Sequence, residues 1–281
     1  MKVCNTIAEM RALSRAERSV GKRLGLVPTM GALHEGHLSL VRAAKAQTNV
    51  VAASIFVNPT QFAPNEDFDK YPRTFERDCQ SLENEDVDVI FAPSVEEMYP
   101  EKLITYVTVE GLSDKLCGRS RPGHFRGVTT VVAKLFHIIE PDVAFFGQKD
   151  AVQLTLIRRM AQDLNFPVKV VGCPIVREPD GLAMSSRNAY LDTEQRGRAV
   201  LLYRSLMRVK EMYEDGERSS ARLVSTAKEI FSAKPGVVLD YFEIVDPETL
   251  DPVAQAMPGC LVAVAAIVGT TRLIDNLLLP P

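Results

Sequence analysis

Several common signatures are missing from this sequence of 281 residues. Its five cysteines are widely spaced and include no C-x-x-C pair, which indicates reduced thiols rather than a disulfide framework or a redox motif. No uninterrupted apolar run is long enough to span a bilayer, and the charged, helical start differs from a signal peptide. We therefore expect a cytoplasmic protein that does not enter the membrane.

An excess of positive charge is also missing. The formal net charge is -3, so nothing in the composition indicates a nucleic-acid partner. Hydrophobic residues make up 46% of the chain and charged residues 25%, which is ordinary for a globular protein and argues against long disordered segments. The length allows one large domain or two unequal ones. A few local cations can still bind a triphosphate on such an acidic protein.

Strand and helix patterns alternate through the first two-thirds of the chain. Apolar strand patterns occupy residues 23–29, 50–57, 87–93, 104–110, 143–147 and 168–176. Helix patterns occupy residues 37–47, 76–85, 128–139 and 150–163. Apolar strands bounded by helices are typical of a parallel sheet that is covered on both faces.

The pattern changes after Val176. A loop rich in turn-forming residues is followed by two helix patterns and then by two strand patterns. The helices are expected at 193–214 and 219–232, and the strands at 238–246 and 261–269. Helices followed by strands indicate a small α+β domain. We therefore predict an α/β protein with two domains, residues 1–176 and residues 177–281.

The segment PTMGALHEGHLSLV, residues 28–41, places two histidines between a strand and a helix. Gly31 permits a tight turn, and the helix is expected to begin near Gly36. Backbone N–H groups at a helix start suit a phosphate. His34 and His37 are three residues apart, so they point to the same side of a helical turn. Ligands of open α/β sheets lie beyond the carboxyl ends of the strands, and we predict a phosphate site here.

A metal site is the alternative interpretation of the two histidines. The zincin pattern needs its histidines four residues apart on a helix, whereas His34 and His37 are three apart with a glycine between them. His124 and His137 are the only other histidines. A three-histidine zinc site is therefore the less favoured interpretation, and no protein-bound metal is predicted here.

Polar residues follow two further predicted strands. Asn58 and Gln61 follow the strand at 50–57, and their uncharged amides suit the orientation of a hydroxy acid. Turn chemistry is a competing explanation that fits Asn58 well and Gln61 less well. Gly147 ends the strand at 143–147 and lets the backbone approach a ligand closely.

Three candidate side chains come directly after Gly147. Lys149 can contact a phosphate, although a lone lysine would be an ordinary solvated one. Asp150 can contact a ribose hydroxyl or cap the following helix, and Gln153 lies one turn further on. Their position at a strand end favours a role in binding.

Two loops add hydroxyl and cationic groups. Ser185, Ser186 and Arg187 lie near the predicted domain boundary, where a mobile loop can close over a site and wrap a triphosphate. A second loop, residues 118–128, is rich in cationic side chains. These are Arg119, Arg121, His124 and Arg126. An anion-binding loop and a solvated basic loop explain the second segment equally well.

Together these motifs resemble the pantoate–β-alanine ligase (pantothenate synthetase) family. The matching segments are PTMGALHEGHLSLV, FVNPTQF, RPGHFRGV, FGQKDAVQL and MSSRN, in the family's order and at comparable spacing. The resemblance runs from about Thr6 to Asp275. PTMGALHEGH and MSSRN together are specific to the family, whereas either alone indicates only the wider nucleotidyltransferase superfamily.

The resemblance implies a Rossmann-like amino-terminal domain and a smaller carboxy-terminal lid domain. It also implies a homodimer, a requirement for Mg²⁺ and a defined reaction. In that reaction ATP, (R)-pantoate and β-alanine give pantothenate, AMP and pyrophosphate through a pantoyl adenylate intermediate.

The resemblance further implies roles for individual positions. His37 corresponds to the family's proton donor, and Gln61 and Gln153 correspond to its pantoate-binding glutamines. The ATP site corresponds to Met30, Gly31, Ala32, Leu33, His34, Glu35, Gly36, His37, Gly147, Gln148, Lys149, Asp150, Val176, Met184, Ser185, Ser186 and Arg187. We expect the catalytic group to be His34, His37, Lys149 and Arg187, and we add Asn58 to the substrate-binding residues.

Other activities remain as alternatives at this stage. A nucleotidylyltransferase would leave a stable nucleotide conjugate, whereas the ligase would release free AMP. A nucleotide-sensing module would bind ATP without turnover. A metal-dependent hydrolase would hold stoichiometric zinc.

Overall fold

The computed structural model describes residues 1–64, 66–232 and 235–281, and the chain divides into two compact units. The first unit comprises Met1–Ser113, Arg121–Gly147 and Leu156–Pro174. The second unit comprises Asp114–Ser120, Gln148–Thr155 and Ile175–Pro281. Each unit therefore combines segments that are distant in the sequence.

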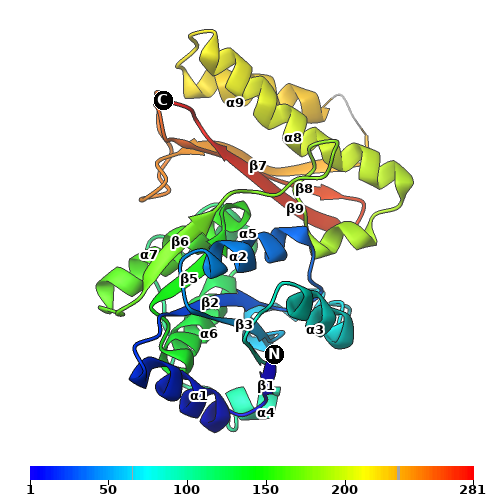
Figure 1. Ribbon diagram of the computed structural model, residues 1–281. Helices are drawn as coiled ribbons and strands as arrows, with labels where there is room; N and C mark the ends of the chain where they lie inside the picture. Colours follow the sequence, from blue (N-terminus) through cyan, green and yellow to red (C-terminus); the bar gives the residue numbers. More distant parts are fainter. Residues whose placement is uncertain (65, 233–234) are drawn as a thin grey trace. The chain divides into compact units, whose positions relative to one another are not determined.

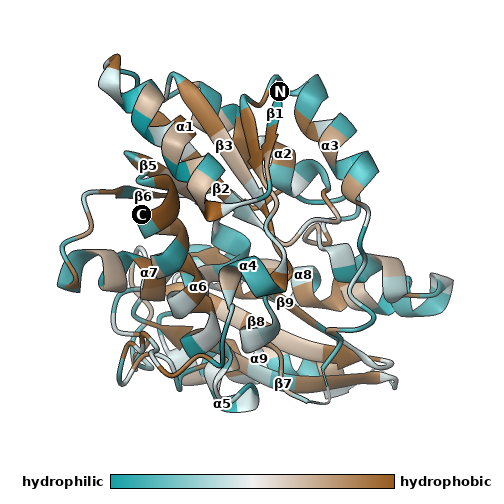
Figure 2. Ribbon diagram, turned by 90° about the horizontal axis from the view of Figure 1, so that it is seen from below, coloured by the Kyte–Doolittle hydropathy of each residue, from teal (hydrophilic) through white to brown (hydrophobic). Residues whose placement is uncertain are grey.

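A six-stranded parallel sheet forms the centre of the first unit. Its strands are β1 (Lys2–Cys4), β2 (Leu24–Thr29), β3 (Val50–Ile55), β4 (Val89–Phe91), β5 (Val143–Gly147) and β6 (Lys169–Cys173). They lie in the order β1-β4-β3-β2-β5-β6, and every pair is parallel. The apolar strands are mainly brown in Figure 2. The α/β fold predicted from the sequence is confirmed.

Helices cover both faces of this sheet. They are α1 (Ile7–Ser19), α2 (Glu35–Lys45), α3 (Phe75–Asn84), α4 (Val95–Met98), α6 (His124–Ile139) and α7 (Ala151–Asp163), with a short 3₁₀ turn η1 (Pro59–Gln61). Helix α2 packs against β2, β3 and β5, while α1 and α6 pack against each other (Figure 1). Within the described residues, every helix is too short or too polar to cross a membrane.

Alternate strand residues of the first unit build its core on the α2 side. Val27, Ala53 and Phe145 come from three neighbouring strands and are fully buried. They pack with Leu40 and Val41, which lie on the sheet-facing side of α2. Alternate residues of the strands and residues on one side of α2 thus pack together in one apolar layer.

Strand β2 lies at the point where the order of the sheet reverses. The chain leaves β2 for β3 on one side, and later returns to place β5 on the other side. The carboxyl ends of β2 and β5, at Thr29 and Gly147, are therefore neighbours. Open α/β sheets bind their ligands beyond such ends, which is where the predicted phosphate loops begin.

The strand predicted at residues 104–110 is wrong, because this segment has no regular secondary structure. Its middle residue, Val107, is held by side chains of α6 instead of by a neighbouring strand. The Val107 N–H donates to Thr130 Oγ1 at 3.0 Å, and its carbonyl accepts from Thr129 Oγ1 at 2.6 Å. Val107 and Val109 are partly buried, whereas the other residues of this segment are exposed, with Ile104 86% exposed.

The second unit contains two long helices and an antiparallel sheet. Its elements are α5 (Cys117–Ser120), η2 (Gln148–Asp150), η3 (Ser186–Tyr190), α8 (Thr193–Glu214), α9 (Ser220–Ser232), β7 (Val237–Val245), β8 (Leu261–Val268) and β9 (Thr271–Leu278). The strands lie in the order β7-β8-β9. The sequence predicted only two strands here, so β9 is an addition.

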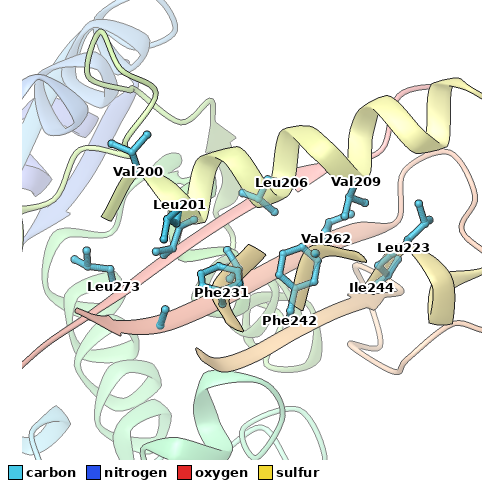
Figure 3. Packing of buried hydrophobic residues seen from close by; sticks show 14 of the residues in the cluster. Val200, Leu201, Leu206, Val209, Leu223, Phe231, Phe242, Ile244, Val262 and Leu273 are labelled. Atoms are coloured by element: carbon cyan, nitrogen blue, oxygen red, sulfur yellow. The ribbon is translucent and has the colours of Figure 1, made fainter. Parts of the chain in front are cut away.

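One apolar cluster joins the helices and the sheet of the second unit. Figure 3 shows Leu206 and Val209 of α8 directed toward Phe242 and Val262 of the sheet. Phe231 of α9 belongs to the same cluster. Residues of both helices thus bury one face of the sheet, as in other α+β domains.

Candidate active site

The turn after β2 has two consecutive residues in the left-handed backbone region. Gly31 has φ 80° and Ala32 has φ 49°. Thr29, the last residue of β2, supports the turn because its Oγ1 accepts from the Gly31 N–H at 3.1 Å and donates to the Ser54 carbonyl at 2.7 Å. A non-glycine residue at φ 49° needs outside support, because its Cβ crowds the backbone.

Asp78 of α3 supplies that support. Its carboxylate, 1% exposed, accepts from the Ala32 N–H at 2.9 Å and from the Leu33 N–H at 2.8 Å. It also accepts from the Thr74 hydroxyl at 3.2 Å. Sequence reasoning missed Asp78, because the segment reads as a polar surface helix. The available signal was its place four residues before Leu82, on the buried side of that helix.

The two histidines cap the first turn of α2 reciprocally. The Gly36 N–H donates to His34 Nδ1 at 3.1 Å, and the His34 N–H donates to His37 Nδ1 at 3.3 Å. The ring centroids lie 4.1 Å apart, so the pair shares one side of the turn as its spacing predicted. Imidazoles here take the place of the hydroxyl and carboxylate groups of an ordinary capping box.

This capping fixes the tautomer of both rings when they are neutral. A ring nitrogen that accepts from a backbone N–H carries no proton, so each Nδ1 is the acceptor and each Nε2 carries the hydrogen. The two Nε2–H groups therefore act as donors beside the amino end of a helix, where the dipole also favours an anion. The arrangement suits phosphate oxygens and the charge that develops on them.

Gln61 and Asn58 form a buried amide pair after β3. Gln61 is 9% exposed; its Oε1 accepts from Asn58 Nδ2 at 3.1 Å, and its Nε2 lies 3.1 Å from Met30 Sδ. The pair thus connects the loop after β3 to the turn after β2. Gln61 is placed next to the proposed phosphate turn by these contacts.

Asn58 has its polar atoms engaged inside the protein. It is 1% exposed, and its Nδ2 also donates to the Gly127 carbonyl at 3.2 Å. Its Oδ1 accepts from the hydroxyl groups of Thr60 at 2.9 Å and Tyr99 at 2.8 Å. Burial raises the pKa of Tyr99, which keeps that hydroxyl a donor. We therefore propose that Asn58 positions Gln61, whereas the sequence suggested direct contact with substrate.

The segment at 118–128 is not the loop that the sequence predicted, because it comprises the end of α5, a three-residue link and the start of α6. Two of its residues support the Gln61 turn from the other side. Arg121 Nη1 lies 3.0 Å from His124 Nε2, and His124 Nδ1 lies 2.7 Å from the Gln61 carbonyl. Arginine has only donors, so His124 Nε2 accepts and its Nδ1–H donates to the carbonyl. Arg121 itself is paired with Glu66, at 2.6 Å from Nε to Oε1. The link between α5 and α6, with His124 at the start of α6, therefore holds the turn that carries Gln61.

The Glu66–Arg121 pair should make the stability of the fold depend on pH in the acid range. Burial alone would raise the pKa of Glu66, but the hydrogen bond and charge of Arg121 outweigh it and lower the pKa below the ordinary 4.5. The folded protein therefore releases this proton more readily than the unfolded chain, and the stabilisation is complete above about pH 4.5 and lost as the pH falls through the lowered value.

We expect Glu66→Gln to lower the free energy of unfolding by about 1–2 kcal/mol near neutral pH, where the pair is ionised. The difference from the wild type should shrink as the pH falls below about 4.5. Urea unfolding across this pH range measures it. Glu101→Gln, at an exposed carboxylate, is the control. Superimposed pH curves for wild type and Glu66→Gln would show that the pair contributes nothing, and parallel but offset curves would show that its contribution does not depend on the ionisation of Glu66.

The other cationic side chains of the 118–128 segment, Arg119 of α5 and Arg126 of α6, also contact protein groups. Arg126 stacks over the Tyr106 ring at 4.5 Å within the first unit. Arg119 pairs with Glu243 within the second unit. These contacts give the 118–128 segment a structural role in each unit.

The second unit carries the residues that follow β5. Lys149 and Asp150 lie on η2, with 3.8 Å between Lys149 Nζ and Asp150 Oδ2. The side chain of Asn276 on β9 donates to the carbonyls of Gln148 and Lys149, both at 2.9 Å. Gln153 follows on the first turn of α7 and is half-buried. Backbone contacts thus fix the turn that bears the lysine.

The MSSRN segment is also ordered in the second unit. The Met184 N–H donates to the Val176 carbonyl at 3.0 Å, which closes the hairpin between them. Ser185 caps η3, since its Oγ accepts from the Arg187 N–H at 3.3 Å. Ser186 begins that 3₁₀ helix. The side chains of Ser185, Ser186 and Arg187 therefore extend from a turn whose backbone is held by hydrogen bonds.

The predicted site residues fall into two sets. The first unit holds Met30 to His37, Asn58, Gln61 and Gly147, and the second unit holds Gln148 to Asp150, Gln153, Val176 and Met184 to Arg187. Glu35 of the first set forms an exposed ion pair with Arg42. Among the residues that the structure describes, no group of three or more His, Cys, Asp or Glu side chains has the arrangement of a metal site.

Comparison with known proteins gives one consistent result. The family model described as Pantoate-beta-alanine ligase matches residues 2–278. The pantothenate synthetase of Koribacter versatilis is 59% identical, over 99% of this chain and 96% of its own. The pantothenate synthetase of Thermotoga petrophila is 57% identical, over 99% and 100%.

Two solved structures are similar along their whole length. The crystal structure of pantothenate synthetase from Thermus thermophilus superposes with a TM-score of 0.95 at 48% identity and covers 100% of both chains. The pantoate–β-alanine ligase from Francisella tularensis superposes with a TM-score of 0.80 at 34% identity, over 99% and 97%. The Francisella structure is described as a complex with beta-gamma ATP and beta-alanine.

Proposed function

This chain belongs to the pantoate–β-alanine ligase family, and on that premise we propose how its residues carry out the reaction. The protein is an ATP-dependent ligase that joins pantoate to β-alanine. We further propose that (R)-pantoate is the enantiomer used, and that the reaction passes through a pantoyl adenylate.

The proposed reaction has two displacements. A carboxylate oxygen of pantoate first attacks the α-phosphorus of ATP, and the bond to pyrophosphate breaks. The amine of β-alanine then attacks the acyl carbon, the bond to AMP breaks, and the amine loses a proton as the amide forms. Neither step needs a covalent enzyme intermediate. Binding, orientation and charge stabilisation therefore carry the catalysis.

The reciprocal capping of His34 and His37 is the observation that carries this proposal. It holds both imidazoles at a helix amino end, beside the reversal point of the sheet, with each Nδ1 fixed by a backbone N–H. Donors fixed before the reaction stabilise charge on a phosphate without reorganisation. We assign these two imidazoles to the phosphate charge, with His37 as the proton donor.

We assign the remaining roles by chemistry and position. Lys149 and Arg187 stabilise the charge of the departing pyrophosphate, together with the hydroxyls of Ser185 and Ser186. Gln61 holds the pantoate for attack, consistent with its fixed amide. Gln153 is assigned to pantoate and Val176 to ATP from the family pattern alone.

Magnesium fits these residues as an ion that enters with the nucleotide. Mg²⁺ is usually held by one or two carboxylates together with substrate phosphates. Asp150, beside Lys149 and with a 49% exposed side chain, is the carboxylate that would reach it. A bound Mg²⁺ neutralises phosphate charge during the displacement.

The wider biological setting is proposed from the family. We propose a cytoplasmic homodimer with small-molecule partners and no nucleic-acid partner. Among the described residues, no two cysteines are joined in a disulfide. The division at residue 176 into a nucleotide-binding domain and a lid domain stays a prediction.

The function is tested by omitting one reactant at a time. AMP release is expected only when ATP, Mg²⁺, pantoate and β-alanine are all present, because the adenylate stays bound without the amine. Without β-alanine, pantoate-dependent exchange of labelled pyrophosphate into ATP should persist. A stable nucleotide conjugate instead of AMP would favour a nucleotidylyltransferase. Exchange that strictly required β-alanine would contradict the two-step scheme.

A further inference from the structure

Strand β9 contains two adjacent polar residues that are both buried. Asp275 and Asn276 are each 2% exposed. Neighbouring residues of a strand point to opposite faces of the sheet. Leu273, which has the same parity as Asp275, belongs to the helix-covered core, so Asn276 points to the other face. One strand therefore presents a polar group on each side.

Asn276 binds the turn that carries Lys149. Its Nδ2 donates to the carbonyls of Gln148 and Lys149, both at 2.9 Å. Its Oδ1 lies 3.4 Å from Gln148 Nε2. Two hydrogen bonds from one amide to successive carbonyls fix the backbone of η2, which packs against β9. Strand β9 therefore fixes the backbone position from which the Lys149 side chain extends.

Asp275 binds the hairpin that leads to the serine-arginine segment. Its carboxylate accepts from both terminal nitrogens of Arg177, at 2.6 and 3.0 Å. The same guanidinium donates to the Gly181 carbonyl at 3.0 Å and stacks over the Tyr203 ring at 4.7 Å. A bidentate arginine pair specifies orientation as well as contact.

This hairpin continues directly into the Met184–Arg187 segment. Arg177 and Ala183 form an antiparallel bridge, one residue inside the bond between Val176 and Met184. The following turn, η3, also packs against β9. The strand thus contacts both segments to which we assign phosphate binding.

We propose that Asp275 and Asn276 are positioning residues for adenylate transfer: together they hold the lysine turn and the serine-arginine segment in one fixed register. The inference rests on the function proposed above. Neither residue is assigned a contact with substrate. Their effect acts through Lys149 and Arg187, whose charges are needed while pyrophosphate leaves and not when the amine attacks.

The test compares two substitutions of Asn276 in the full-length enzyme. Asn276→Ala removes the amide, and Asn276→Asp keeps its size but replaces both N–H donors with an oxygen. Both are expected to lower kcat for pantoate-dependent ATP–pyrophosphate exchange by about 10–100-fold, the scale of a small displacement of catalytic groups. Aminolysis of supplied pantoyl adenylate by β-alanine should keep its wild-type rate.

A matched control separates positioning from stability. Leu277→Ala removes a neighbouring side chain that packs on the core of the second unit, on the face of β9 opposite Asn276. It should lower the melting temperature and leave exchange unchanged below that temperature. For the other side of β9, Arg177→Lys keeps the charge, loses the bidentate geometry and should slow exchange selectively. Asp275→Asn removes the charge that pairs with Arg177 and should also slow exchange selectively. Arg177→Lys tests the same contact if Asp275→Asn does not fold.

The outcomes are distinct. Wild-type exchange rates in Asn276→Asp, or equal slowing of exchange and aminolysis in both variants, would overturn the positioning role. If the wild-type enzyme itself releases no AMP from pantoate and β-alanine, the proposed function fails instead. Selective loss of exchange in the Asn276 and Arg177 variants, with Leu277→Ala unaffected, would support the inference.

Discussion

Replacing His37 or Lys149 with alanine is expected to slow adenylate formation by about 10²- to 10³-fold while the fold is retained. Each substitution removes one group assigned to phosphate charge. His37 lies on the first turn of α2, and Lys149 lies on η2. Both residues are partly exposed, so the loss concerns chemistry more than stability. Single-turnover pyrophosphate release measures it directly.

A second substitution separates catalysis by His37 from its role in the helix cap. His37 Nδ1 accepts from the His34 N–H, so alanine also removes a capping contact worth about 1 kcal/mol. His37→Gln places an ordinary capping-box residue at the same helical position and retains an acceptor. We expect its melting temperature to approach that of the wild type while its adenylation rate stays as low as that of His37→Ala.

The controls for these variants remove a histidine and a lysine at other positions of the protein. His137→Ala and Lys169→Ala change exposed residues of α6 and of the amino end of β6, away from the phosphate turns. Both should release pyrophosphate at the wild-type rate. Unchanged adenylation in His37→Ala and Lys149→Ala would remove these two residues from the catalytic group.

Gly127→Ala is expected to have a large effect on the first unit's site although it adds a single methyl group. Helix α6 meets η1 at Gly127, where a Cβ atom would lie 2.3 Å from the Thr60 carbonyl oxygen and 2.7 Å from the Gln61 nitrogen. Both neighbours are backbone atoms and cannot rotate away. The turn bearing Gln61 must therefore shift, which should cost about 1–3 kcal/mol of stability or more.

The same shift should impair pantoate binding. Asn58 also donates to the Gly127 carbonyl, so displacement of the helix disturbs the residue that orients Gln61. We expect kcat/KM for pantoate to fall by about 100-fold, because misplacement by about 1 Å has effects of that size. Steady-state kinetics with varied pantoate, together with thermal unfolding, would measure both consequences.

Gly197→Ala is the matched control, since Gly197 also lies inside a helix. A Cβ atom there would meet nothing within 4 Å, and the residue is not buried. Alanine should be neutral or stabilise α8 by up to about 1 kcal/mol, because glycine is a poor helix former. If Gly127→Ala behaves like this control, the close approach of α6 to η1 does not constrain the site.

The local features of the fold were predictable from the sequence. Helix α8 has the predicted bounds of 193–214, because a regular helical pattern and a capping Asp192 define it. The two histidine rings also lie together, since a spacing of three on a helical turn leaves little freedom. Short-range geometry determined both results.

The residues that support the site depend on distant contacts and were missed. Asp78 meets the phosphate turn from 46 residues away, and Asn276 meets Lys149 from 127 residues away. In the sequence, Asp78 resembles a solvated helix residue, while Asp275 and Asn276 interrupt the apolar pattern of β9 and concealed that strand. From the sequence alone, a polar residue is expected to be exposed. A buried polar residue with a distant partner is therefore recognised only in the three-dimensional structure.

The left-handed pair Gly31–Ala32 has a consequence for engineering. Its shape is maintained by a carboxylate on another element, Asp78 of α3. A peptide carrying PTMGALHEGH alone would lack this support, and its Ala32 would relax to a common backbone conformation. The proposed nucleotide loop is therefore not a portable module, and a designer who grafts it onto another scaffold must transfer the supporting helix with it.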